Sequence, residues 1–172
     1  MNSTKVFSRV LIPLIFIVLA YEWIISGIDK LLSGTFISRL HDQFVQAIPD
    51  IKYPFYARIL NQLLPYSTYL AWMILIASFF VGLSFVLLAF VISNNQLSAP
   101  MLSLGIAAGI LSAFMSLNFF FFQSGTYFIH AADPFDEGIS LDFIMFLLQI
   151  SIAAACSIQL KAGRRSFYTY RL

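Results

Sequence analysis

Four long apolar runs dominate the sequence, at residues 10–28, 66–92, 100–122 and 139–160. An α-helix of about 20 residues crosses the roughly 30 Å hydrocarbon layer of a bilayer, so each run is long enough to span a membrane. Charged residues make up 10% of the 172-residue chain, whereas soluble domains contain about 25%. The sequence therefore predicts an all-α membrane protein, a four-helix transmembrane bundle that forms one domain over residues 1–172.

The segment between the first two runs, residues 29–65, is too long for a simple turn. Residues 36–48 and 54–64 each show amphipathic helical spacing, and the second stretch is bounded by Pro54 and Pro65. The apolar faces that this spacing predicts comprise Phe36, Ile37, Leu40, Phe44 and Ile48 in the first stretch and Phe55, Ile59 and Leu63 in the second. We expect two short interfacial helices in this first outer loop, which either only cap the bundle or act as a lid.

Four tyrosines around this loop are placed as an aromatic belt would be, namely Tyr53, Tyr56, Tyr66 and Tyr69. Tyrosine is enriched at membrane–water interfaces because its ring is apolar and its hydroxyl is polar. The sequence therefore predicts that these side chains hold the two short helices at the interface.

Basic residues flank both ends of the chain, at Lys5, Arg9, Lys161, Arg164, Arg165 and Arg171. The loop before the fourth run carries acidic residues without a base, and the first loop has basic and acidic residues together. Because cytoplasmic flanks are enriched in lysine and arginine, we expect both termini in the cytoplasm, with the chain in a bacterial inner membrane.

A signal peptide is the alternative for the N-terminus, with Lys5 and Arg9 before an apolar stretch that ends in Val18-Leu19-Ala20. The apolar run continues past that point through Trp23. Cleavage there would leave three spans, so a first transmembrane helix is the favoured interpretation.

Small residues within the runs indicate where helices could approach closely in lipid, where apolar burial contributes little to association. The third run has Gly105, Gly109 and Ala113 in one stripe, beside Ala108, Ser112 and Ser116. The second run has Ser78 and Gly82, and the fourth has Ser151 and Ala155. These positions predict a compact bundle.

Glu22 lies inside the first run, about seven residues before its end. A charged side chain deep in a bilayer costs roughly 2.5–3.5 kcal/mol on insertion scales, so Glu22 should face the bundle and find a partner or a proton. Ser26, Asp29 and Lys30 follow at i+4, i+7 and i+8 and therefore share one helical face with Glu22.

Polar residues near the outer ends of the other runs could meet this face, namely Asn118, Gln123 and Asp142. With both termini inside, the outer ends of all four helices converge on one leaflet, and the polar residues named above lie near those ends. The sequence thus predicts one polar layer of Glu22, Ser26, Asp29, Lys30, Asn118, Gln123 and Asp142. This layer is a ligand-binding pocket, a structural polar network, or a contact for a partner subunit.

Other chemistries find little support in the sequence. His41 and His130 fall in loops without metalloenzyme spacing, so a solvated or capping role is favoured over a haem or metal ligand. Cys156 lies within an apolar run and reads as a buried, inert thiol. The net charge of +2 gives no indication of nucleic-acid binding, and no motif identifies catalytic residues or a metal site.

The stretch "WIISGIDKLLSGTF" resembles the DoxX/DoxD-like membrane family in Gly27, Lys30, Leu31, Gly34 and Phe36. The stretch "MSLNFFFFQSG" is similar to the asparagine–aromatic segment of that family, whereas residues 123–138 and the Asp142 region depart from its pattern. The resemblance implies a four-span bundle with cytoplasmic termini, and it places Lys30 and Asn118 in the polar layer. Known members are subunits of a thiosulfate:quinone oxidoreductase or accompany redox and detoxification complexes.

Two functions follow as hypotheses. The chain is either a small membrane subunit of a redox complex, linked to quinone as the one cofactor candidate, or a non-catalytic accessory or assembly subunit. In the first, Glu22 and Asp142 carry protons and Lys30 orients an anion or a carbonyl. In both, the expected partners are membrane lipid and other subunits of a membrane complex. A small transporter is disfavoured because the sequence shows no internal repeat.

Overall fold

The computed structural model describes residues 3–94, 96–125 and 140–169, and the regular structure in these ranges is helical. The four long helices are α1 (Ser3–Leu32), α4 (Ser67–Ser93), α5 (Ala99–Phe122) and α6 (Leu141–Thr169). The connection from α1 to α4 contains α2 (Phe36–Ala47), the 3-10 turn η1 (Ile48–Asp50), α3 (Pro54–Leu63) and the 3-10 turn η2 (Leu64–Tyr66). The short helices α2 and α3 therefore lie at the two ranges where the sequence predicts them.

Four helical segments within the described ranges are long and apolar enough to cross a membrane, which confirms the predicted multi-pass membrane protein. They are Val10–Leu32, Pro54–Ser93, Ala99–Phe122 and Leu141–Ala162. The second segment begins earlier than predicted because α3 and η2 lead directly into α4. Exposed apolar side chains cover the outside of the long helices, which is the surface that contact with lipid requires.

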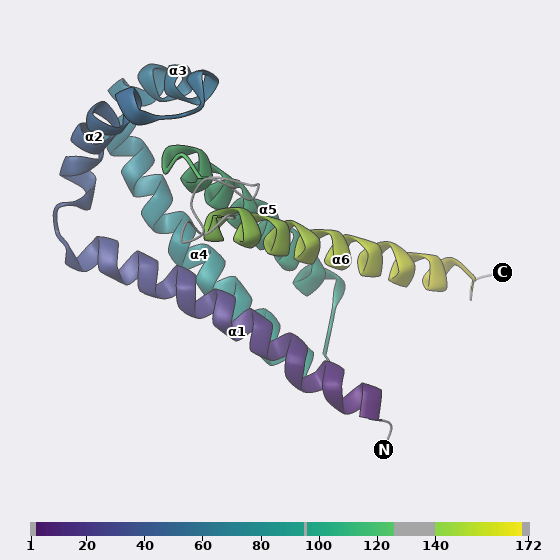
Figure 1. Cartoon of the computed structure of the whole chain (residues 1–172). Coiled ribbons are helices and arrows are strands. Elements are labelled where there is room, and N and C mark those ends of the chain that lie inside the picture. Colours follow the sequence, from purple (N-terminus) through teal and green to yellow (C-terminus); the bar gives the residue numbers. More distant parts are fainter. Residues whose placement is uncertain (1–2, 95, 126–139, 170–172) are drawn as a thin grey trace, which may run out of the picture.

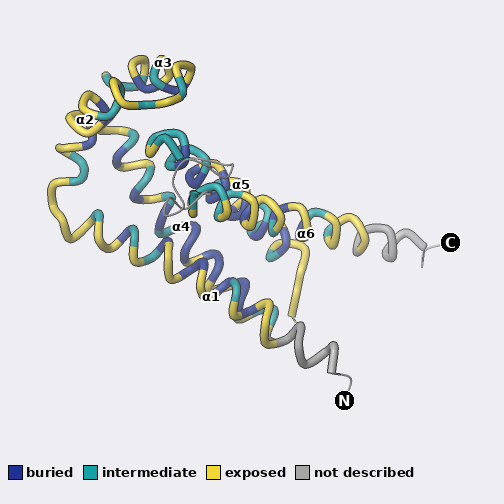
Figure 2. Tube along the Cα trace, viewed as in Figure 1, coloured by how far each residue is buried: buried dark blue, intermediate teal, exposed yellow. Residues whose placement is uncertain are grey.

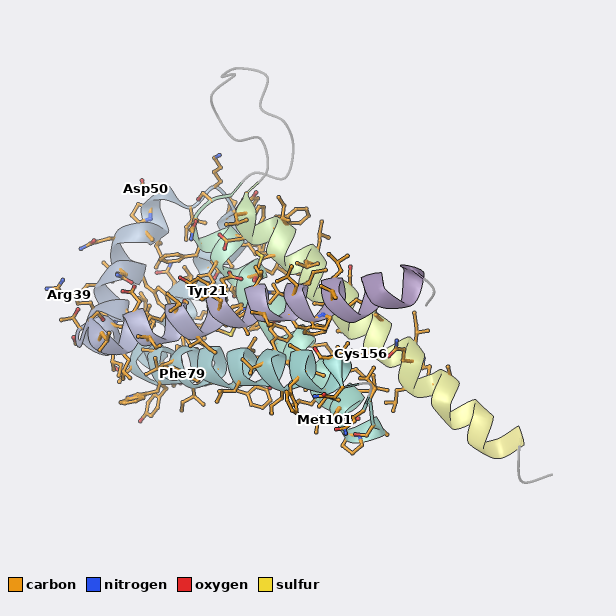
Figure 3. All side chains as sticks on the ribbon, turned by 90° about the horizontal axis from the view of Figure 1, so that it is seen from below. Tyr21, Arg39, Asp50, Phe79, Met101 and Cys156 are labelled. Atoms are coloured by element: carbon orange, nitrogen blue, oxygen red, sulfur yellow. The ribbon has the colours of Figure 1, made fainter. Side chains whose placement is uncertain are left out.

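The long helices form two pairs, α1 with α4 and α5 with α6, and a smaller contact between α4 and α5 joins the pairs (Figure 1). Helix α2 packs on α4, and α2 and α3 lie together at one end of the molecule. The beginning of α1 and the end of α6 both lie toward the opposite end (Figures 1 and 3). The fold therefore has a helical cap at one end, and the beginning of α1 and the end of α6 at the other.

Glycines allow the close approach within each pair. A Cβ atom on Gly82 of α4 would lie 2.5 Å from Cγ1 of Ile24 and 3.3 Å from the carbonyl oxygen of Ala20, both on α1. A Cβ atom on Gly109 of α5 would lie 3.0 Å from Cβ of Ala153 on α6. Small residues bring membrane helices together in this way, because backbones can then meet directly.

The predicted role of Ser151 and Ala155 in packing is wrong, because both side chains are exposed on α6. The face of α6 that meets α5 carries Gln149, Ala153 and Cys156 instead. The glycines of α5 determine which face of α6 packs there. Because glycine has no side chain, the backbone of α6 can approach α5 closely at these positions. The thiol of Cys156 is buried there against Gly105.

The main core lies among α1, α4 and α5, and its residues are among the dark blue stretches of the tube in Figure 2. Phe85 of α4 is completely buried, and its ring meets that of Phe16 of α1 edge to face with centroids 5.7 Å apart. The other buried members are Leu19, Ala20, Trp23, Val81, Leu88, Ala89, Ala108 and Met115. Three of the four long helices thus contribute fully buried side chains to one core.

A second core lies beneath α2 and α3. Leu40 and Phe44 of α2 are buried there, in agreement with the face that the sequence predicts. On α3 the predicted face is displaced by one residue, because Tyr56 and Leu60 are buried while Phe55 and Ile59 are 51% and 44% exposed. The reason is tertiary, since the ring of Tyr56 packs on Phe121 of α5 with centroids 5.5 Å apart.

The four tyrosines of the predicted belt divide into two groups. Tyr66 and Tyr69 are exposed, as interfacial anchors would be. The hydroxyls of Tyr53 and Tyr56 instead donate to groups at the end of α5, 2.8 Å to the carbonyl oxygen of Gly125 and 3.1 Å to that of Asn118. These two tyrosines fasten the cap to the bundle.

Candidate functional site

Lys30 occupies the meeting point of three helices near the end of α1. Its ammonium group donates to the carbonyl oxygen of Ser26 at 3.2 Å and also to the Ser26 hydroxyl. The same nitrogen lies 5.8 Å from the ring centroids of Phe36 on α2 and Phe119 on α5. A cation over an aromatic face is attracted to it, so the two rings and the serine hold the half-buried ammonium in place.

Acidic side chains lie within electrostatic range of this ammonium. Glu22 and Asp29 both interact electrostatically with Lys30, and Glu22 is also close enough to Asp142 of α6 for the two carboxylates to repel each other. Asp142 is half-buried, whereas Glu22 and Asp29 are exposed on the surface of the chain. The prediction that Glu22 faces the bundle is therefore wrong, because the residues of α1 that pack into the core are its neighbours Leu19, Ala20 and Trp23. We call Glu22, Ser26, Asp29, Lys30 and Asp142 the Lys30 cluster.

The Lys30 cluster joins residues that lie more than a hundred positions apart in the sequence. The i, i+4, i+7, i+8 spacing places four of its members along α1, as the sequence indicates. Asp142 joins them from the first turn of α6. One cation thus lies within electrostatic range of two carboxyl groups, and one of these, Glu22, also interacts with Asp142. Such an arrangement can hold a proton and can also present a positive charge to a ligand oxygen.

Asn118 makes a different set of contacts from the one predicted. Its carbonyl oxygen and its Oδ1 accept from the Tyr56 hydroxyl at 3.1 and 3.2 Å, and its Nδ2 donates to the carbonyl oxygen of Phe114 at 2.7 Å. The side chain therefore ties α3 to α5, next to Phe119. Gln123 is exposed beyond the end of α5 and lies outside the Lys30 cluster.

Residues 50–53 lie across the end of α5 and close the cap. The Lys52 amide donates to the Ser124 hydroxyl at 3.0 Å, and that hydroxyl donates to the carbonyl oxygen of Asp50 at 3.3 Å. Ser124 has a φ of 55°, the left-handed conformation in which its backbone turns away from the helix. These bonds attach the segment between α2 and α3 to the end of α5.

Removing the Tyr56 hydroxyl tests this attachment. Tyr56→Phe should lower the free energy of unfolding by about 1 kcal/mol, because it deletes the hydrogen bonds to Asn118 while keeping the ring contact. Denaturation in mixed detergent micelles measures the change. Tyr69→Phe is the matched control, since the exposed Tyr69 hydroxyl should contribute nothing; equal effects in both variants would contradict the attachment.

The histidine hypotheses are decided in part. His41 Nδ1 lies 3.3 Å from the carbonyl oxygen of Leu64 and 3.4 Å from the Ser67 hydroxyl, so His41 closes the turn between α3 and α4. His130 lies outside the described residues, as do Asp133, Asp136 and Glu137. Among the described side chains, no group of three His, Cys, Asp or Glu residues could hold a metal ion.

Sequence reasoning missed one functional candidate, Gln149 of α6. Its side chain is completely buried, and its Oε1 accepts from the Ser116 hydroxyl at 2.9 Å. The signal was present, because an amide inside an apolar run meets the same intramembrane criterion that singles out Glu22.

Comparisons of the chain with protein-family models, with curated proteins and with solved structures found no match.

Proposed function

We propose that this protein is a small integral membrane subunit of a redox complex and that the Lys30 cluster is its quinone site. The observation that carries the proposal is the position of the Lys30 ammonium beside the rings of Phe36 and Phe119, with Glu22 in electrostatic range of both Lys30 and Asp142 of α6. The resemblance of the stretch from Trp23 to Phe36 to the DoxX/DoxD-like family supports the same function.

The residues of the cluster fit the chemistry that a quinone needs. A bound quinone takes up electrons and protons, and in this proposal the electrons come from a partner subunit. Lys30 donates to a carbonyl oxygen of the ligand, and the rings of Phe36 and Phe119 provide apolar surface beside it. Glu22 and Asp142 hold protons within reach of that oxygen, which is the task of a general acid in a water-poor site.

The orientation in the membrane is part of the proposal. Both termini face the cytoplasm of a bacterial cell, and α2 and α3 lie at the outer interface with Tyr66 and Tyr69 exposed there. The basic residues near both ends of the chain support this orientation. The position of the beginning of α1 and the end of α6, away from the cap, supports it as well.

Neutralising Glu22 tests the proton-carrying role. Glu22→Gln should lower quinone turnover of the complex about 100-fold, which is the low end of the rate loss expected when a general acid is removed. The amide has the size of the carboxyl group but cannot release a proton. Turnover is measured on membranes and on the complex purified in mild detergent. Asp42→Asn on the exposed face of α2 is the control. Unchanged turnover in Glu22→Gln, with normal assembly, removes this role.

An accessory subunit is the second candidate, and the exposure of α6 favours it. Of the four candidate spans, Leu141–Ala162 has the smallest buried share, and its free side carries apolar side chains such as Ile144, Leu147 and Ile158. A neighbouring subunit or lipid would cover that side. Purification in native lipid separates the candidates, since an accessory subunit is recovered with its partners, whereas a monomer with its own activity excludes that role.

A further inference from the structure

Two neighbouring polar side chains of α1 are exposed at the middle of its membrane span. The span covers Val10–Leu32, so residue 21 is its midpoint. Tyr21 is 67% exposed there, and Glu22 beside it is exposed as well. At a rise of 1.5 Å per residue, Glu22 lies about 15 Å along the helix from Leu32. Both side chains are therefore at the depth where a bilayer is most apolar.

These side chains lie on the side of α1 that faces away from α4. A Cβ atom on Gly82 of α4 would meet Ile24 and the carbonyl oxygen of Ala20, so these two residues mark the side that α4 covers. Residues two positions apart in an α-helix are separated by about 200° around its axis. Glu22 is two positions from both Ala20 and Ile24 and therefore points to the opposite side.

The exposed side has the residue spacing of a helix-packing surface. We call Val18, Tyr21, Glu22 and Ile25 the Glu22 face, and these residues stand at i, i+3, i+4 and i+7. The two apolar members, Val18 and Ile25, are 60% and 44% exposed. In the described part of the chain, α4 is the long helix that packs along α1, and it lies on the other side. The Glu22 face is thus an unpartnered helix face with a carboxyl group at its centre.

Lipid does not satisfy this face. An ionisable side chain in the hydrocarbon layer is costly unless it has a polar partner, and the described residues give neither Tyr21 nor Glu22 a hydrogen bond. The Lys30 ammonium attracts Glu22 from a distance, but its close contacts are Ser26 and the rings of Phe36 and Phe119. Lipid headgroups stay at the interface, about 15 Å from Glu22. The partner must therefore itself reach the middle of the membrane.

The charges near Glu22 indicate the chemistry of that partner. Asp142 of α6 lies within electrostatic range of Glu22, and Asp29 lies within range of Lys30, so three carboxyl groups accompany one ammonium group. Attraction between opposite charges is strong in a medium of low dielectric constant, so a cation fits this surplus of acids. A second copy is disfavoured, because a two-fold interface through this face would bring Glu22 against Glu22.

From these observations we infer that the Glu22 face docks a transmembrane helix of another subunit, and that this helix carries a lysine or arginine at mid-membrane depth to pair with Glu22. Val18 and Ile25 supply the apolar contact on either side of the ion pair. The inference rests on the proposed membership of a membrane complex and adds the chemistry of the partner. It does not depend on the binding of a quinone.

A synthetic transmembrane peptide tests the docking without knowledge of the natural partner. The probe is a leucine peptide of about 20 residues with one lysine at its centre. Association with the fluorescently labelled protein is measured by energy transfer in phosphatidylcholine vesicles. The central-lysine peptide should bind about tenfold more tightly than an all-leucine peptide or a peptide with the lysine at one end of the span, which is the usual strength of a polar contact between membrane helices. Equal binding of the three peptides overturns the inference.

Variants of the protein show whether Glu22 is the group that binds the lysine. Glu22→Leu should remove the preference for the central-lysine peptide, and Glu22→Gln, which keeps the size of the side chain, should reduce it. Ser151→Leu is the matched control, because Ser151 is an exposed polar residue near the middle of the span Leu141–Ala162. It should leave the preference unchanged. A preference that survives in both Glu22 variants, or that falls equally in Ser151→Leu, contradicts the docking.

The same vesicles distinguish the other occupant and the proposed function. Energy transfer between two differently labelled copies of the protein that is lost in Glu22→Leu would assign the face to a second copy and overturn the inference. Absence of lysine selectivity together with a turnover loss in Glu22→Gln would contradict the docking alone. Lysine selectivity together with unchanged turnover in Glu22→Gln would support the docking and contradict only the proton-carrying role.

Discussion

Gly82→Leu should separate α1 from α4 and lower the free energy of unfolding by about 3 kcal/mol, the upper part of the usual range for overpacking. The first atom of the new side chain would already lie 2.5 Å from Ile24 Cγ1 and 3.2 Å from the Ile24 backbone nitrogen. The Ile24 side chain can move, but the α1 backbone behind it can give way only if the whole helix moves. Denaturation by SDS in mixed micelles measures the loss.

The control for this prediction is a larger side chain on the outside of the same helix. Val86→Leu adds volume at an exposed position of α4 and should leave stability unchanged. If Gly82→Leu unfolds at the same SDS fraction as the original protein, direct backbone contact between α1 and α4 does not hold this pair together.

Gly109→Leu should have an effect of similar size, about 1–3 kcal/mol, on the other helix pair. A Cβ atom there would lie 3.0 Å from both Ala153 Cβ and the Gln149 carbonyl oxygen, and 3.1 Å from the Ala153 nitrogen. Two of these three atoms belong to the α6 backbone, so α6 itself must move away from α5. The same movement pulls the Gln149 amide from the Ser116 hydroxyl.

Ala107→Leu is the matched control for Gly109→Leu, since it adds a leucine to the exposed side of α5. Stability is again measured by denaturation in mixed micelles. A stable Gly109→Leu protein would show that α6 can pack on α5 without this close approach.

The membrane spans were predictable because their signal is local. A run of about 20 apolar residues identifies a span without any knowledge of its neighbours. The rotation of each helix was less predictable, since a run that is apolar on all sides gives no periodicity from which to choose a face. On α6 this led to Ser151 and Ala155, whereas the glycines of α5 select the face with Ala153. On α3 the contact with Asn118 turned Tyr56 inward.

In the candidate site too, contacts within one helix were predictable from the sequence and contacts between helices were not. Helical spacing predicted that Glu22, Ser26 and Lys30 share a face, and the hydrogen bonds of Lys30 to Ser26 agree with it for that pair. The meeting of Asp142 with Glu22 depends on how α6 lies against α1, and the sequence offered this only as one combination among several. The sequence placed Asn118 in the same layer, but in the structure its side chain accepts a hydrogen bond from the hydroxyl of Tyr56 on α3. Helical spacing gives no information about such contacts between segments that are far apart in the sequence.

The division into two tight pairs has a consequence for the acids. Each pair is held by backbone approach at a glycine, whereas the pairs meet mainly through the smaller seam between α4 and α5. The softest deformation of such an assembly is a rocking of one pair against the other. Glu22 belongs to one pair and Asp142 to the other, so rocking alters the repulsion between their charges. Because the two equilibria are thermodynamically linked, uptake or release of a proton by these acids in turn changes the preferred angle between the pairs.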